Sequence, residues 1–370
     1  MPSAFATCLG SLAGSSMTKV ILQDIGRTLR EHAILIATIC LYGLAMWWVV
    51  GHYKLPYRFA PNMVAYAQLL YIPLALALSA HVLYVMVFIR PHRLVDHLQQ
   101  SLKPYFSLRR VLLAAPVLLL FPLFASTFTF FKSAIPAINP YVWDATLMHL
   151  DGWLHGGVQP WVLLQPILGY PVVTGAINVL YNLWFFVAHG MFVLLAFTTS
   201  RPEIRMRYLL SYTLSWIVLG TLGAIAFASM GPCFSPEAER NGVYAPLMNY
   251  LMQTNETIPV WSLDVQQFLW DAYQQNRIGM GSGISAMPSL HVAVATLMAI
   301  TGWQFSRRWG IALTAYALII FLGSIHLGWH YAVDGYMGAI GAWGIWWLVG
   351  GLLSKGQSFL LRTSPKRVGL

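Results

Sequence analysis

Two short motifs carry the side chains of this sequence that are best suited to chemistry. The first runs from Ala286 to His291 (AMPSLH) and the second from Gly328 to Asp334 (GWHYAVD). His330 and Asp334 are four residues apart, so on a helix they lie on one face about one turn apart. Ionisable groups inside apolar segments are costly and mark functional sites, and a histidine oriented by a carboxylate acts as a nucleophile or a base. His291 is a candidate for the acid that such a reaction also needs.

The His330 and Asp334 pair has two other interpretations. A histidine and an aspartate can fasten two membrane helices together by a hydrogen bond. With His326 they form a row spaced by four residues, which on an unbroken helix would suit a metal ion. A helix break near Gly328 would destroy that row, and we find no convincing glutamate or cysteine nearby to complete a metal site. We therefore predict neither a metal nor another cofactor.

The first motif has the features of a helix start. Pro288 suits the first turn of a helix, and the glycines before it allow the backbone to approach a ligand closely. A helix N-terminus with free N–H groups and a hydroxyl binds anions, which points to Ser289. The alternative is that Ser285 only caps the helix and that His291 is an interfacial packing residue.

The composition is that of a multi-pass membrane protein. Hydrophobic residues make up 58% of the chain, charged residues only 9%, and the mean hydropathy is +0.62. We predict an all-α polytopic membrane protein with about eight transmembrane helices. The apolar segments long enough to span a bilayer lie at residues 32–50, 62–89, 111–131, 171–199, 208–230, 286–304, 309–328 and 330–353.

The positive charges predict the orientation of these helices. When the 22 lysines and arginines are assigned to alternating sides, only five fall on the minority side, namely Lys54, Arg58, Lys132, Arg240 and Arg277. The positive-inside rule then places both termini in the cytoplasm and both motifs near the periplasmic, extracellular or lumenal face. Topology therefore explains the net charge of +10. We expect no nucleic-acid partner, because no basic face on a soluble domain is present.

We divide the chain into four parts. Residues 1–31 form a cytoplasmic lead-in with a short interfacial helix, and residues 32–110 two accessory transmembrane helices. Residues 111–353 form a six-helix catalytic core, which includes an outer cap loop at 231–285, and residues 354–370 form a basic cytoplasmic tail. Within the outer segments, residues 143–154 and 261–273 have the apolar spacing of helices that lie on the membrane surface and border the site.

The two motifs resemble those of a known family. A Pro-Ser-x-His motif followed by His-Tyr-x-x-Asp on a neighbouring helix is similar to the phosphatidic acid phosphatase type 2 (lipid phosphate phosphatase) superfamily. The sequences AMPSLHVA and WHYAVDG are most similar to its transferase branch, which includes inositol-phosphorylceramide synthases and sphingomyelin synthases. The resemblance is specific over residues 280–345, and it implies the six-helix core.

The resemblance also implies a role for each motif residue. His330 would attack phosphorus to form a phosphohistidine, and Asp334 would orient its ring. His291 would protonate the leaving oxygen and then deprotonate the accepting hydroxyl, while Ser289 would bind a phosphoryl oxygen. These roles agree with those argued from the residue types alone.

The sequence lacks two basic motifs of the phosphatases. Their early Lys-x6-Arg-Pro motif has no counterpart, since Leu83 and Leu194 stand at the lysine positions, and their arginine before the second histidine is Ser324 here. Phosphoryl transfer needs cations or equivalent donors. Lys132 and Arg277 are candidates to bind the substrate, the alternatives being a snorkelling anchor and an ordinary loop charge.

These observations predict a membrane phosphotransferase that acts on membrane lipids. It would move a phosphoryl or phospho-headgroup, for example of phosphoinositol type, from a lipid-linked donor to an alcohol at the outer or lumenal face. Hydrolysis of a lipid phosphate or polyprenyl diphosphate by the same residues is the alternative. A transporter with a His–Asp proton relay is a remoter one, because it gives no account of the Pro-Ser-x-His motif.

Overall fold

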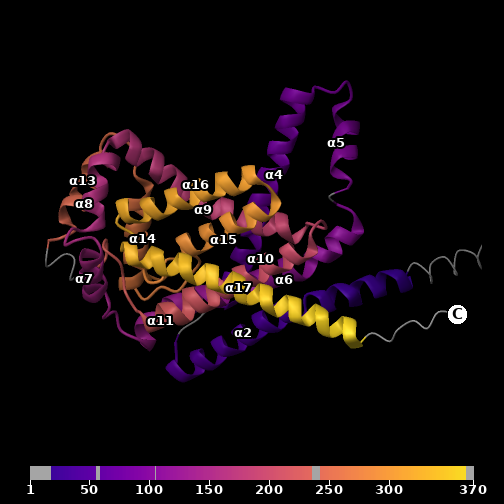
Figure 1. The fold of residues 1–370 in the computed structure, drawn as a ribbon, viewed down its shortest axis with the longest axis horizontal. Coiled ribbons are helices and arrows are strands. Elements are labelled where there is room, and N and C mark those ends of the chain that lie inside the picture. Colours follow the sequence, from indigo (N-terminus) through magenta and orange to yellow (C-terminus); the bar gives the residue numbers. More distant parts are fainter. Residues whose placement is uncertain (1–17, 56–58, 105, 236–241, 364–370) are drawn as a thin grey trace, which may run out of the picture.

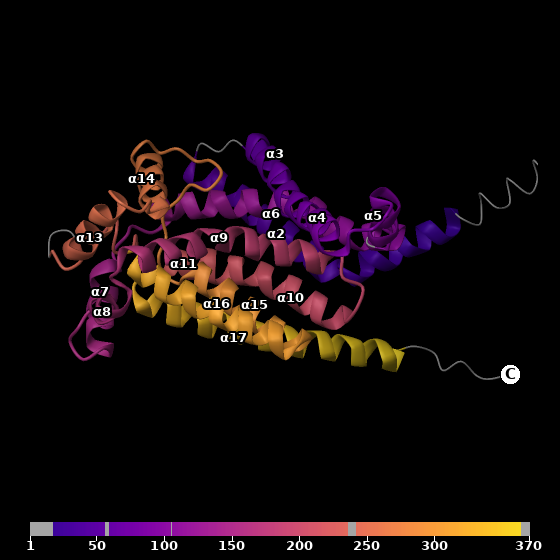
Figure 2. The same cartoon turned by 90° about the horizontal axis from the view of Figure 1, so that it is seen from above.

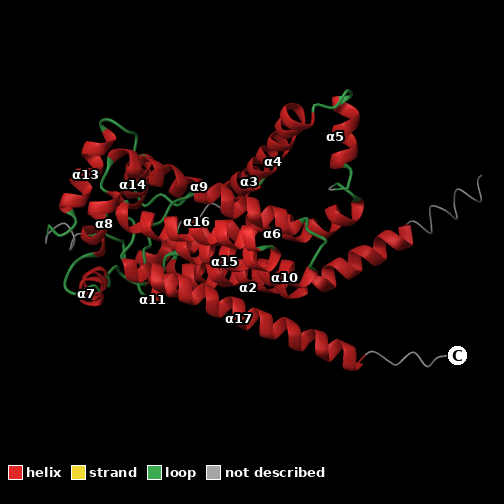
Figure 3. Cartoon of the chain, turned by 45° about the horizontal axis from the view of Figure 1, so that its top comes forward, coloured by secondary structure: helices red, strands yellow, loops and turns green. Residues whose placement is uncertain are grey.

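A computed structural model describes residues 18–55, 59–104, 106–235 and 242–363 (Figure 1). Within these ranges every regular element is a helix, and turns and loops join them (Figure 3). The predicted all-α polytopic architecture is therefore confirmed. Seven described helices are long and apolar enough to cross a membrane, at Ala33–Tyr53, Met63–Ile89, Leu108–Ile138, Pro171–Ala196, Pro202–Ala226, Arg307–His326 and Ala332–Lys355.

The prediction of an eighth span at residues 286–304 needs a correction. The helix there, α15 (Leu290–Phe305), is apolar but has only 16 residues. It begins four residues later than expected because Ala286 and Met287 are bonded elsewhere. Their N–H groups donate to the backbone oxygen and the hydroxyl of Ser229, at 3.0 and 3.1 Å, so this stretch is a loop.

The first half of the described chain contains the accessory helices and the first core helix. Its elements are α2 (Ala33–Tyr53), α3 (Phe59–Leu69), α4 (Tyr71–Tyr84), η1 (Val85–Ile89), α5 (Leu94–Leu102), α6 (Leu108–Ile138), α7 (Asp144–Leu154) and α8 (Pro160–Leu168). Residues 18–31 are also helical, where the sequence predicts a short interfacial helix.

The second half contains the two motifs. Its elements are α9 (Pro171–Ala196), α10 (Pro202–Leu214), η2 (Ser215–Gly223), α11 (Ala224–Ala226), α13 (Ala245–Asn255), α14 (Trp261–Gln274), α15, α16 (Arg307–His326) and α17 (Ala332–Thr363). Residues 143–154 and 261–273 are helical as predicted and correspond to α7 and α14, while their position on the membrane surface stays a prediction.

The long helices form one bundle with a distinct cap at one end. The helix α15 packs against α16 and α17, α9 packs against α16, and α2 and α3 pack against α6. Short helices α7, α8, α13 and α14 gather at one end of the bundle, which we call the capped end (Figures 1 and 2). The end of α17 and the start of the N-terminal helix both extend from the opposite end of the bundle, where they diverge (Figures 1 and 2). Which end faces the cytoplasm stays a prediction.

The end opposite the cap is fastened by a buried arginine. The Arg205 guanidinium on α10 donates to the carbonyl oxygens of Leu195, Ala196 and Leu113, and also to Nε2 of His32. These acceptors come from three segments, namely α9, α6 and the turn before α2. A buried guanidinium is stable only when its donors are satisfied, so Arg205 fixes these helices relative to one another.

Candidate active site

A cavity of about 320 Å³ lies in the bundle beneath the capped end. Its wall is largely apolar and rich in aromatic side chains, and it comes mainly from α3, α6, α9, α10, η2, α14, the start of α15 with the loop before it, and the turn before α17. The described residues that line it include one lysine, Lys132, and no arginine, aspartate or glutamate. His291 and His330 both line it, so the structure brings the two sequence motifs to one space.

His330 lies in the turn between α16 and α17, and not within a helix as the predicted span 330–353 implied. The N–H groups of Trp329 and His330 both donate to the Ser324 carbonyl oxygen at 3.0 Å, which ends α16. Gly328 has φ +75°, a conformation that favours glycine, and lets the chain turn back sharply. Ser324, at the position of the family's arginine, is thus buried and holds the backbone of the turn.

This turn also breaks the row of possible metal ligands. His326 is the last residue of α16, and its Nε2 is 2.9 Å from the Thr174 hydroxyl on α9. Within the described parts of the chain, no group of three or more His, Cys, Asp or Glu side chains is placed to hold a metal ion.

Asp334 holds His330 by its ring. Asp334 lies in the first turn of α17, and its Oδ2 is 3.3 Å from Nδ1 of His330 and accepts the Tyr331 N–H at 3.0 Å. Because a carboxylate only accepts hydrogen bonds, we assign the ring proton to Nδ1. The second ring nitrogen, Nε2, then carries a lone pair and has the electronic character of a nucleophile.

His291 lies in the first turn of α15, with its ring centroid 6.1 Å from that of His330. Two rings of α9 cover it, Tyr181 at 4.9 Å and Trp184 at 4.2 Å between centroids. In the described structure its ring nitrogens have no carboxylate partner. His291 therefore differs from His330 in being held by aromatic faces and by no hydrogen-bonded carboxylate.

Ser289 joins the two motifs and caps α15. Its hydroxyl accepts the Val292 N–H at 3.5 Å, and its own N–H donates to the Asp334 carbonyl oxygen at 2.9 Å. Ser289 is fully buried and is not among the residues that line the cavity. Ser285, the cap in the alternative interpretation, lines the cavity instead. The structure therefore gives Ser289 the capping role that this interpretation assigned to Ser285.

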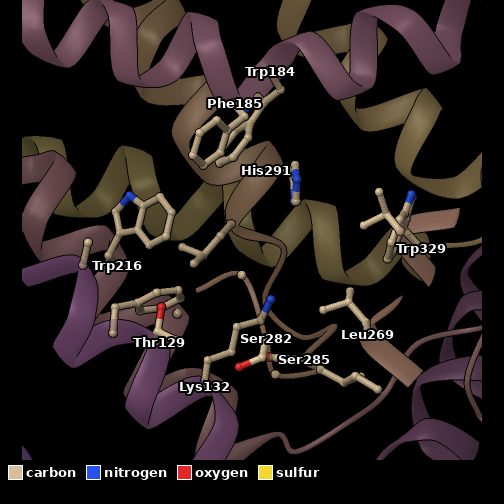
Figure 4. A pocket seen from close by; sticks show the side chains of 18 of the residues that line it. Thr129, Lys132, Trp184, Phe185, Trp216, Leu269, Ser282, Ser285, His291 and Trp329 are labelled. Atoms are coloured by element: carbon tan, nitrogen blue, oxygen red, sulfur yellow. The ribbon is translucent and has the colours of Figure 1, made fainter. Parts of the chain in front are cut away.

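Lys132, on α6, is directed into the cavity towards His291 (Figure 4). Its ammonium has no hydrogen-bond or ion-pair acceptor among the described residues. Gly283, with φ +91°, packs on the Lys132 backbone so closely that a Cβ would lie 2.8 Å from the Lys132 carbonyl carbon. Arg277, the other predicted substrate-binding cation, is exposed after α14 and does not line the cavity.

Several hydrogen-bond donors of the cavity wall also lack acceptors. The Tyr181 hydroxyl and the indole N–H groups of Trp184 and Trp329 are buried and have no partner within the described structure. Unpartnered buried donors are costly, so a ligand that supplies oxygen acceptors would be favoured here. Three polar residues of α9, Tyr181, Asn182 and His189, line the cavity.

The sequence interpretation missed two buried aspartates on α7. Asp144 accepts the N–H groups of Met230 and Gly231, each at 2.9 Å, and the Tyr331 hydroxyl at 3.0 Å. Asp151 accepts the N–H groups of Ala332 at 2.6 Å and Val333 at 2.9 Å.

Hydrogen bonds offset the cost of burying both carboxyl groups. Burial raises the pKa of Asp144 and of Asp151 above the ordinary value, and their N–H donors oppose that rise. Their spacing of seven residues, two helical turns, was the available signal, because it places both on one face of α7.

The comparisons with known proteins agree with the motifs. A family model described as the PAP2 superfamily matches residues 145–348, more than half of the chain. No curated protein and no solved structure matches. The matched region contains His291, His330, Asp334 and Asp151, whereas α6 with Lys132 precedes it. With both histidines of the motifs on one cavity and inside the matched region, the chain belongs to the PAP2 superfamily.

Proposed function

We propose that this protein is a membrane phosphotransferase in which His330 and His291 act in turn on one lipid-linked phosphate. Membership of the PAP2 superfamily supports a lipid enzyme of phosphatase or phosphotransferase type. The observation that carries the proposal is the position of the two histidines, which line the same cavity with ring centroids 6.1 Å apart. At that separation both rings can reach one phosphorus centre and its leaving oxygen.

In the first half-reaction, Nε2 of His330 attacks phosphorus. An N–P bond forms and the P–O bond to the lipid alcohol breaks, while His291 in its protonated form gives its proton to the leaving oxygen. The Nδ1 hydrogen bond to Asp334 keeps the attacking lone pair on Nε2 and stabilises the positive charge that develops on the ring.

In the second half-reaction, the neutral His291 takes the proton of an alcohol acceptor. The acceptor oxygen attacks phosphorus, the N–P bond breaks and His330 is regenerated. One group thus serves as acid and then as base, and such proton transfer contributes about 10²–10⁴ in rate. The small size of the cavity supports an order in which the first lipid alcohol leaves before the second enters.

Lys132 and neutral hydrogen-bond donors of the cavity wall stabilise the negative charge of the phosphoryl group. Lys132 is the cation of the cavity wall, and the α15 N-terminus and the unpartnered Tyr181 and Trp184 donors add hydrogen bonds for phosphoryl oxygens. These groups replace the two missing basic motifs. The direct roles predicted for Ser289 and Arg277 in binding the substrate stay predictions.

We propose transfer to an alcohol, as in the inositol-phosphorylceramide and sphingomyelin synthase branch, in preference to hydrolysis. The absence of the phosphatase clamps from the sequence and the aromatic wall of the cavity support this choice. We also propose that the site faces the periplasm, the cell exterior or an organelle lumen, because the charge distribution predicts it.

Product analysis tests the proposal. The purified protein is incubated with phospholipid donors with and without lipid or polyol alcohols, and products are identified by mass spectrometry. We expect a phosphodiester product that requires the alcohol and that His330→Ala does not form. Release of the free phosphate or phospho-headgroup at the same rate without any alcohol would establish the hydrolase instead.

A further inference from the structure

The start of α17 is closed by a carboxylate from another helix. The first N–H groups of a helix have no acceptor within it, and at α17 they are next to the proposed nucleophile. Asp151 of α7 accepts two of them, those of Ala332 and Val333, through its two different oxygens. Asp151 is 1% exposed, so these bonds are shielded from water.

Asp334 shares this helix start with Asp151. It is the acidic residue in the first turn of α17, and its Oδ2 already accepts from His330 and from the Tyr331 N–H. Its Oδ1 is buried and has no partner among the described residues. An aspartate in the first turn is well placed to bind the free N–H groups of its own helix.

We propose that Asp151 is a positioning residue for the nucleophile. By occupying the Ala332 and Val333 N–H groups, it leaves the Asp334 carboxylate for the His330 ring. Asp151 does not line the cavity and has no hydrogen bond to His330, so its proposed effect on the nucleophile runs through the start of α17 and Asp334. This inference rests on the proposed role of His330.

The second aspartate of α7 supports the same arrangement. Asp144 accepts the Tyr331 hydroxyl and the N–H groups of Met230 and Gly231, two helical turns from Asp151. Gly231, with φ +92°, packs against the Trp329 carbonyl oxygen so closely that any Cβ would collide with it. The turn that carries His330 is therefore held between α7 and the loop after α11.

A double-mutant cycle tests the proposal. Turnover is measured for Asp151→Ala, Asp334→Ala and the double variant at saturating donor, together with the donor KM. We expect Asp151→Ala to lower kcat about 10–100-fold, as for an outer partner of an active group, with KM changed less than about twofold. In the Asp334→Ala background the same change should cost less than about threefold, because the residue through which it acts is gone.

Conservative variants and a control complete the experiment. Asp151→Asn keeps one carbonyl acceptor and should fall between the wild type and Asp151→Ala. Asp264→Asn removes an exposed carboxylate from α14 and should leave kcat unchanged. Thermal unfolding in detergent shows whether each variant is folded. If Asp151→Ala does not fold, Asp151→Asn takes its place in the double-mutant cycle.

Two different results distinguish failure of the positioning role from failure of the proposed function. An equal loss in both backgrounds would overturn the positioning role and leave the proposed function intact. Full turnover by His330→Ala would overturn the function itself.

Discussion

Two helices of the core begin beside the same cavity, and their N-termini differ in whether carboxylates accept the first N–H groups. At α17 the first N–H groups are bonded to the carboxylates of Asp334 and Asp151. At α15 only the neutral Ser289 caps the start, and the N–H groups of Leu290 and His291 have no acceptor in the described structure. Leu290 and His291 both line the cavity.

The difference assigns separate tasks to two similar helix ends. A helix N-terminus attracts anions, and one that already holds carboxylates cannot attract a phosphate as well. In the proposed mechanism the α17 start orients the nucleophile, while the α15 start, with Lys132 across the cavity, binds the phosphoryl oxygens. The backbone bond from the Ser289 N–H to the Asp334 carbonyl oxygen fixes the two ends relative to each other.

The largest expected effect at the α15 end comes from His291. His291→Asn keeps a polar side chain of similar size but cannot transfer a proton, so kcat should fall about 10²–10⁴-fold. A nitrophenyl phosphodiester donor, whose leaving group needs no proton, should recover most of the first half-reaction. Equal losses with the natural lipid donor and the nitrophenyl donor, measured by stopped-flow absorbance and product analysis, would exclude the acid role.

Removal of the cavity cation should have the next largest effect. Lys132→Met preserves the length and the apolar stem but removes the charge, so we expect kcat/KM to fall about 10²–10³-fold, as when one transition-state donor is lost. Lys54→Met removes an exposed lysine that does not line the cavity and is the matched control. Similar steady-state kinetics for both variants would mean that Lys132 is only an anchor.

A smaller effect should follow when the α15 end is made to resemble the α17 end. Ser289→Asp and Ser289→Asn introduce side chains of equal size that both cap helices, but only Asp adds a negative charge. We expect kcat/KM for the anionic donor to be about tenfold lower for Asp than for Asn, because the carboxylate repels the phosphate. Equal kinetics for the two variants would show that this helix end does not bind the phosphate.

The sequence was sufficient for the fold class and for the proximity of the two motifs. Composition and apolar runs identify a helical membrane protein because a bilayer leaves few other structures. Charge asymmetry placed His291 and His330 near one face, and they do share a cavity. The length of α15 was overestimated, since the loop bonds of Ala286 and Met287 to Ser229 link distant residues that no local pattern reveals.

The surroundings of the motifs were less predictable. Asp144 and Asp151 belong to a predicted surface helix. In the structure they are buried, and their carboxylate oxygens accept backbone N–H groups from two other segments of the chain. The side of the membrane predicted for Lys132 made it a candidate, but only the structure shows that it lines the same cavity as His291. Without the residue at which α15 begins, the sequence could not show whether Ser285 or Ser289 caps it.

The central claim is that His330 carries the phosphorus between donor and acceptor. The direct measurement is a rapid acid-free quench of the protein with a donor labelled at phosphorus, followed by peptide mass spectrometry of the labelled chain. We predict an acid-labile label on His330 that appears without acceptor, disappears when an alcohol is added and is absent from His330→Ala. Turnover at the normal rate with no label on His330, or undiminished turnover by His330→Ala, would contradict the account.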